Sequence, residues 1–258
     1  MVIPRDLVRL LGTGTLKRTL QQKNDKVTII KVSRLIFRGM MRLELPITQD
    51  YLILTEKITT RPVLRTRFTT QAYLVLATFL DLRDQHLITL TPQHVTIPDF
   101  DRLQATLPAS LQELVTRLRT AVTVSSATAD VFKLLVSWNL ANAIYDTMGP
   151  QLAATQQVEP VVFQNNLLPH TIYVPQEAAK QRVIKQLEAE IRQRRLTPAH
   201  QDLLAIFDRL QALQWLLPAD LVTQWSAAQS KDTPIQQLTA LAQHRITMRK
   251  FELDSWLS

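Results

Sequence analysis

Cysteine is absent from the 258-residue chain, which excludes disulfide bonds, thiolate metal sites and cysteine nucleophiles. Glycine is scarce, with four residues, and this favours helices over a fold rich in tight turns. No apolar run reaches the roughly 18 residues that a membrane span needs. The apolar stretch 27–37 is interrupted by Lys31 and Arg34, unlike the centre of a signal peptide. We therefore expect a cytoplasmic protein.

The net charge of +8 is concentrated at the N-terminus. Residues 1–40 contain nine basic and two acidic residues, so they carry a net charge of +7. The remaining 218 residues are nearly neutral and give no electrostatic indication of nucleic-acid binding.

Residues 1–40 are therefore interpreted as a basic leader, and the folded domain is predicted to span residues 41–258. Two explanations of the leader remain open. A basic amphipathic segment can lie on an acidic membrane surface. Alternatively, the native chain starts at Met40 or Met41, which we favour because the regular apolar pattern begins there.

The pattern after residue 41 predicts a mainly α fold, with a single globular helical domain and one small β-hairpin. The hairpin is expected at residues 86–98, where two short β-branched runs flank Thr-Pro-Gln. Helices are predicted near residues 46–58, 71–84, 110–122, 128–149, 176–195 and 199–217, with further helices after Pro218 and Pro234. Helix 71–84 is apolar nearly all round, so we expect it to be buried.

Local signals predict where several helices begin and end. Thr48, Thr69 or Thr70, and Thr197 followed by Pro198 are predicted N-terminal caps. Ser110 and Glu113 have the spacing of a capping box. Gly149 and Pro150 are expected to stop helix 128–149, and Trp138 is expected to lie on its buried side. Residues 158–166 read as a short extended piece.

No pattern in the chain points to catalysis or to a metal. The five histidines lack metal-ligand spacing, and the Gly-x-Ser-x-Gly motif is absent. Asp99 and Asp101 flank Phe100 in a pattern more typical of a turn than of a cation site. The segment 11–17, LGTGTLK, lacks the remaining residues of a dinucleotide or phosphate loop. We predict a protein that is not an enzyme and that has no cofactor.

The segment 61–68, RPVLRTRF, is the candidate binding site. Arg61, Arg65 and Arg67 crowd one loop beside Phe68. Guanidinium groups bind phosphate through paired hydrogen bonds, and an aromatic ring can enter a membrane interface. The alternative is a solvated loop whose arginines pair with nearby carboxylates.

The order of these elements resembles the Golgi phosphoprotein 3 family, whose bacterial members are shorter than the eukaryotic ones. The resemblance covers roughly residues 42–245 and is strongest at residues 178–217, AAKQRVIKQLEAEIRQRRLTPAHQDLLAIFDRLQALQWLL. It implies a mostly helical fold with a hairpin that can mediate self-association. It also implies a peripheral membrane adaptor that binds phosphatidylinositol 4-phosphate.

The resemblance implies a headgroup site that this chain keeps only in part. The family uses a loop Trp and Arg before the buried helix and an Arg pair on a later helix. Here the loop has three arginines and no Trp. Asn139 and Asn142 stand at the positions that correspond to the family's later arginine pair. We expect an anionic-lipid adaptor on the inner face of the membrane, with self-association through residues 86–98 and an unidentified protein client. The alternative is a soluble helical interaction module without lipid binding.

Overall fold

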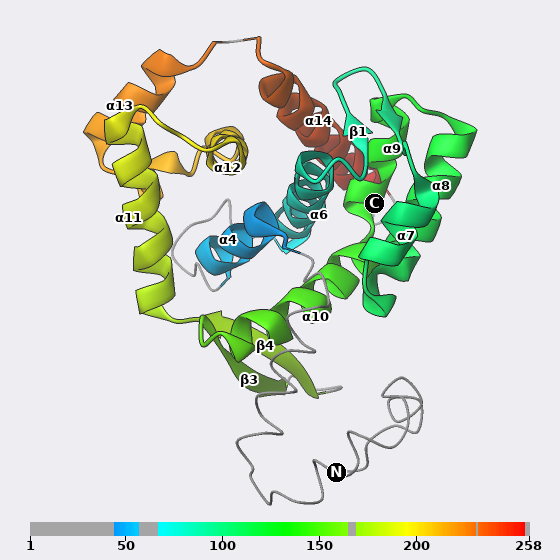
Figure 1. Ribbon diagram of the computed structural model, residues 1–258, viewed down its shortest axis with the longest axis horizontal. Helices are drawn as coiled ribbons and strands as arrows, with labels where there is room; N and C mark the ends of the chain where they lie inside the picture. Colours follow the sequence, from blue (N-terminus) through cyan, green and yellow to red (C-terminus); the bar gives the residue numbers. More distant parts are fainter. Residues whose placement is uncertain (1–43, 57–66, 165–168, 231, 256–258) are drawn as a thin grey trace, which may run out of the picture. The chain divides into compact units, whose positions relative to one another are not determined.

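The computed structural model describes residues 44–56, 67–164, 169–230 and 232–255. All of these lie in the unit Leu43–Ser258, and the predicted leader 1–40 falls outside them. The described residues form ten α-helices and two antiparallel two-stranded sheets, so the predicted mainly α class is confirmed (Figure 1).

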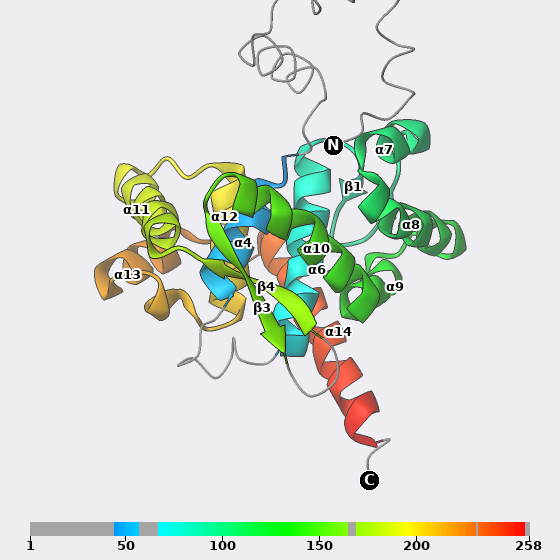
Figure 2. The ribbon, with the colours of Figure 1, turned by 90° about the horizontal axis from the view of Figure 1, so that it is seen from below.

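The helix α6 (Arg67–Asp84) is the centre of the core. Residues 72–82 are consecutive and each is at most 3% exposed, as the pattern of apolar residues all round predicts. Five elements cover α6: α4 (Pro46–Thr55), η2 (Phe132–Val136), α10 (Trp138–Ala154), α12 (Pro198–Arg209) and α14 (Pro234–Ser255). Figures 1 and 2 both show α4, α10, α12 and α14 around α6.

The other helices complete the described chain. They are α7 (Phe100–Thr106), η1 (Ala109–Leu111), α8 (Gln112–Val124), α9 (Thr128–Val131), α11 (Glu177–Gln193), η3 (Leu213–Trp215) and α13 (Ala219–Ala228). Thr197 caps α12 by accepting a hydrogen bond from the His200 N–H, as predicted, and helices begin after Pro218 and at Pro234.

The predicted hairpin at 86–98 is present but short, with strands β1 (Thr89–Leu90) and β2 (Val95–Thr96). Backbone hydrogen bonds join Val95 to Ser126 and Thr128 to Gln93, so the outer side of this hairpin is already partly paired. A longer hairpin, β3 (Val158–Gln164) with β4 (Pro169–Pro175), was predicted only as one extended piece. Its seven paired positions run from Val158↔Pro175 to Gln164↔Pro169.

Several predicted caps are wrong. Thr48 lies inside α4 and its side chain bonds Asp81, while Thr69 and Thr70 lie inside α6. The capping box also fails: Leu111 is the N-cap of α8, and Ser110 accepts a hydrogen bond from Thr147 instead. In each case a distant polar partner or an earlier helix start replaced the local cap.

The predicted helix 128–149 is broken at Ser137, which caps α10 through the Leu140 N–H. Trp138 is 51% exposed at the start of α10, so its predicted burial is wrong. The predicted stop at Gly149 and Pro150 is also wrong, because α10 continues to Ala154. A Cβ on Gly149 would lie 2.2 Å from the ring of Tyr173, so this glycine makes room for β4.

Candidate functional site

The structure places only part of the predicted arginine site. Arg61 and Arg65 lie outside the described residues. Arg67 is the first residue of α6, although its side chain is not described. Phe68 is half-buried and packs against the core. The arginine segment therefore leads directly into the first turn of the central helix.

Uncharged side chains occupy the position at which the family resemblance implies two arginines. Asn139 and Asn142 lie on α10, and the Asn142 Oδ1 accepts a hydrogen bond of 3.3 Å from the Gln71 Nε2 of α6. Among the described groups, the buried Gln71 Oε1 has no partner. Amide groups can bind neutral or weakly charged polar groups, but they supply no net charge against a phosphate.

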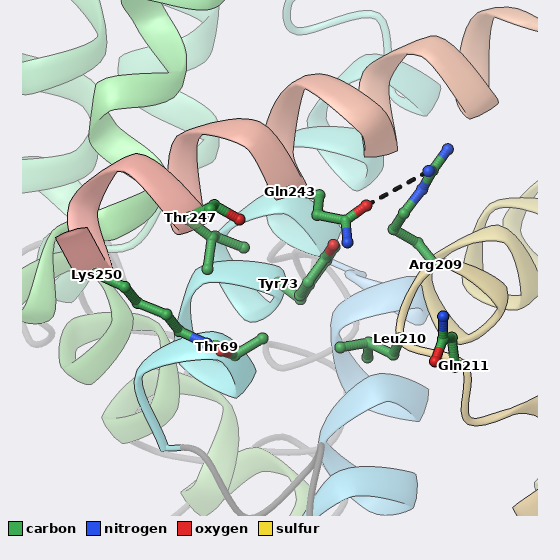
Figure 3. A pocket seen from close by; sticks show the side chains of 9 residues that line it. Thr69, Tyr73, Arg209, Leu210, Gln211, Gln243, Thr247 and Lys250 are labelled. Atoms are coloured by element: carbon green, nitrogen blue, oxygen red, sulfur yellow. Dashed lines mark hydrogen bonds between the residues drawn. The ribbon is translucent and has the colours of Figure 1, made fainter.

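A pocket of about 290 Å³ lies on another side of α6. Its lining comes from three helices and the two residues that follow α12, as Figure 3 shows. The polar side chains are Thr69 and Tyr73 of α6, Arg209 of α12, Gln211, and Gln243, Thr247 and Lys250 of α14. None of the described residues that line it is a carboxylate. The pocket therefore has a positive charge of +2 from Arg209 and Lys250.

The Arg209 guanidinium makes fewer hydrogen bonds within the described residues than it has N–H groups. Arg209 donates to the Gln243 Oε1 at 3.4 Å and to the Gln236 carbonyl at 3.3 Å. These long contacts use two of the five N–H groups of a guanidinium. A neighbouring hollow of about 340 Å³ shares Arg209, Gln211 and Gln243 and is bordered by Asp208.

The hydroxyl groups of the pocket differ in their surroundings. Thr69 is 8% exposed, and its Oγ1 has no hydrogen-bond partner in the described part of the chain. Burial raises the pKa of Tyr73, while Arg209 lowers it less strongly. The phenol therefore stays protonated at neutral pH and can donate a hydrogen bond.

The C-terminal half of α14 exposes apolar side chains. Met248, Phe251 and Leu253 are 43%, 66% and 40% exposed. They flank Lys250, which lines the pocket. Since successive residues of a helix are turned by about 100°, Met248 and Phe251 lie on a different side of α14 from Lys250 and Leu253. Exposed aromatic, aliphatic and cationic side chains on one helix are features that peripheral proteins present to an acidic membrane interface.

The opposite end of α6 contains a buried polar cluster. Asp81 is 1% exposed and its carboxylate accepts three hydrogen bonds from the first turn of α4. The donors are the Ile47 N–H at 3.0 Å, the Thr48 N–H at 2.8 Å and the Thr48 hydroxyl at 2.6 Å. Burial raises the pKa of Asp81 to about 7, although these hydrogen bonds lower it. Asp81 thus caps α4 from a distance in the sequence.

Two ion-pair systems tie α12 to the same region. Arg83 of α6 bonds Asp202, and burial raises the pKa of that aspartate to about 6 despite the cation. The His200 imidazole lies 2.8 Å from Glu190 and 3.5 Å from Asp50. Burial opposes its charged form, but hydrogen bonds to the two carboxylates outweigh burial and raise the pKa of His200.

These buried acids and bases are paired with one another rather than directed at a cavity. Within residues 44–255, apart from the undescribed gaps, no group of three or more histidine or carboxylate side chains has the geometry to hold a metal ion. We interpret the cluster as a structural junction between α4, α6, α11 and α12.

Comparison with known proteins does not identify a family for this chain. No family model matches the chain, and no curated protein matches its sequence. The resemblance to the Golgi phosphoprotein 3 family therefore stays a prediction from the sequence pattern.

Arg209 and Lys250 were not predicted as site residues. They lie far from residues 61–68 in the sequence, and only the fold brings Lys250 beside Thr69. The run Arg249–Lys250–Phe251 was the one local signal, since it places basic residues next to an aromatic.

Proposed function

We propose that this protein is a non-enzymatic adaptor that associates with the surface of acidic membranes through the arginine segment 61–68 and the C-terminal half of α14. The observation that carries the proposal is the shared pocket of Thr69 and Lys250. Thr69 follows the last arginine of the segment by two residues, and Lys250 stands beside the exposed Phe251. Basic and apolar groups from separate parts of the chain therefore belong to one neighbourhood.

Two further observations support peripheral attachment. No described helix is both long enough and apolar enough to cross a bilayer. The resemblance to Golgi phosphoprotein 3 implies a lipid-binding adaptor built on the same class of fold. Phosphatidylinositol 4-phosphate is the family's lipid, but the neutral Asn139 and Asn142 favour general attraction to anionic lipid over recognition of that headgroup.

Sedimentation with liposomes tests the proposal. Each cation near an acidic surface contributes about 1 kcal/mol. Replacing Arg61, Arg65 and Arg67 with Ala should therefore weaken binding to phosphatidylserine vesicles by roughly two decades. Binding to pure phosphatidylcholine should be weak for both proteins.

A matched control separates a defined surface from bulk charge. Lys185, Arg192 and Arg195 are exposed on or just after α11, and their replacement with Ala removes the same charge. This control should retain most of the binding. An equal loss in both triple variants, or no loss in the first, contradicts a role for residues 61–68.

The alternative is a soluble helical interaction module without lipid binding. The neutral Asn139 and Asn142 favour it, because they stand where the family has headgroup cations, and Asn142 already bonds Gln71. Wild-type protein that fails to sediment with any acidic vesicle would favour this alternative. Self-association through residues 86–98 stays a prediction, which deletion of that hairpin and analytical ultracentrifugation would test.

A further inference from the structure

We infer that His200 forms a pH-sensitive connection between α12 and α4. Its protonated ring bridges Glu190 of α11 and Asp50 of α4, and loss of the proton releases the contact with α4. We call these two contacts the His200 bridge. The inference does not depend on the proposed membrane association, because it concerns a contact inside the fold.

The first argument is the position of the imidazole ring between two carboxylates. His200 is buried in the first turn of α12, and the carboxylates belong to two other helices. Its Nδ1 atom lies 2.8 Å from the Glu190 Oε2, and its Nε2 atom lies 3.5 Å from the Asp50 Oδ2. A charged imidazole has an N–H on both nitrogens, whereas a neutral one has an N–H on one of them. Only the protonated ring can therefore donate to both carboxylates.

The second argument is the inequality of the two contacts in the neutral ring. Glu190 also accepts a hydrogen bond of 3.0 Å from the Thr197 N–H, so it is fixed beside the start of α12 and keeps the remaining proton on Nδ1. The Nε2 lone pair then faces the Asp50 carboxylate, and two acceptors repel each other. Asp50 is half-buried, so its carboxylate can turn toward water. Deprotonation of His200 therefore breaks the contact with α4 and keeps the contact with α11.

The pKa of His200 sets the pH range. Burial opposes the charged form, but hydrogen bonds to Asp50 and Glu190 raise the pKa above its ordinary value of about 6.5. The stabilisation by the bridge is therefore complete below about pH 6.5 and is lost as the pH rises through the folded-state pKa. The other charges nearby, Asp202 of α12 and Arg83 of α6, bond to each other instead.

Loss of the bridge should loosen α4 locally. The buried side chains Val183, Leu187 and Ile191 keep α11 in place in both protonation states. The helix α4 also packs on α6 and α12 through apolar side chains, so the fold as a whole persists. A shallow opening of one helix is the kind of change that hydrogen exchange detects.

Hydrogen exchange followed by mass spectrometry, on the full chain at about pH 6 and about pH 8.5, tests the inference. After correction for the intrinsic exchange rate, the α4 peptide of the wild type should exchange about fivefold faster at the higher pH. In Asp50→Asn the side-chain amide can accept from a charged ring and donate to a neutral one, so this ratio should be at least about threefold smaller.

The Asp50→Asn variant also separates His200 from Asp81. Asp81 bonds the first turn of α4 and has a raised pKa, but it is unchanged in this variant and accounts for the pH response that remains. His200→Gln should show the same reduced ratio. His244→Gln removes an exposed histidine of α14 and should respond to pH as the wild type does. An equal ratio in the wild type and Asp50→Asn overturns the inference.

Nuclear magnetic resonance of the imidazole nitrogens gives an independent test, with the His200→Gln spectrum as the assignment. At about pH 8.5 the ring of His200 should be neutral and should carry its proton on Nδ1, because Glu190 accepts from that atom. A neutral ring protonated on Nε2 would contradict the proposed geometry. A ring that stays charged at about pH 8.5, or that loses its proton below about pH 6.5, would also overturn the inference.

Discussion

The buried polar groups at the two ends of α6 differ in whether they have hydrogen-bond partners. Near its C-terminal end, the Asp81 carboxylate and the Thr48 hydroxyl are buried and fully hydrogen-bonded to each other and to the backbone of α4. Near its N-terminal end, the Thr69 hydroxyl is buried without a described partner, and Thr69 lines a pocket together with Lys250. The first arrangement stabilises the fold, whereas the second leaves hydrogen-bonding capacity for a ligand.

The largest effect is expected from Asp81→Ala. The substitution leaves two backbone N–H groups of α4 buried without an acceptor and leaves the Thr48 hydroxyl only its 3.2 Å bond to Thr78, so the free energy of unfolding should fall by about 3 kcal/mol. Urea unfolding followed by circular dichroism measures it. Asp101→Ala, at an exposed position of α7, should change stability by less than about 0.5 kcal/mol. Similar losses in the two variants would mean that burial of the acceptor is unimportant.

The pH dependence of stability should be next in size. The pKa of Asp81 is about 7 in the folded protein and about 3.9 in the unfolded chain, so the folded state binds this proton more tightly. Its contribution to stability is complete below about pH 4 and is lost as the pH rises to 7. Asp202 and His200, which also have raised pKa values, act in the same direction.

Asp81→Asn isolates the part due to Asp81. Between pH 5 and 7, the wild type should lose about 2 kcal/mol more than the variant, within the limit of about 1.4 kcal/mol per pH unit for one proton. Urea unfolding at several pH values gives both curves. Parallel curves would show that Asp81 has no raised pKa.

A pair of threonine substitutions compares the two ends of α6 directly. Thr48→Val removes the hydroxyl that bonds Asp81 at 2.6 Å, so it should destabilise the protein by about 1–2 kcal/mol. Both threonines lie inside helices and Val keeps the branched shape, so helix propensity changes little. Thermal or urea unfolding measures the difference.

Thr69→Val should have the smallest effect, and its sign is informative. The hydroxyl has no described partner, so its removal should leave stability unchanged or raise it by up to about 1 kcal/mol. A loss as large as that of Thr48→Val would show that Thr69 is already paired within the protein.

Local sequence signals predicted the elements better than their junctions. Thr197 and Pro198 were identified correctly because a cap and a first-turn proline act within a few residues. Thr48 was not, because its partner Asp81 lies 33 residues away, and no local pattern encodes such a contact. Gly149 read as a stop, but its missing side chain accommodates Tyr173 of a distant strand.

The candidate site shows the same limit. The arginine segment was evident from composition, yet Arg61 and Arg65 lie outside the described residues. Arg209 and Lys250 belong to helices in which exposed cations are ordinary, so their place in the lining of one pocket depends on tertiary packing. Sequence periodicity predicts which side of a helix is buried, but it does not predict which helices adjoin.

The encirclement of α6 also affects how the protein is made. Its last residue, Asp84, is translated about 150 residues before the first residue of α14, one of the helices that cover it. At about 5–20 residues per second, the ribosome needs roughly 8–30 seconds to synthesise that interval. During this time a helix that is apolar nearly all round lacks part of its cover. We therefore expect the nascent chain to expose apolar surface of α6 until the last helix emerges.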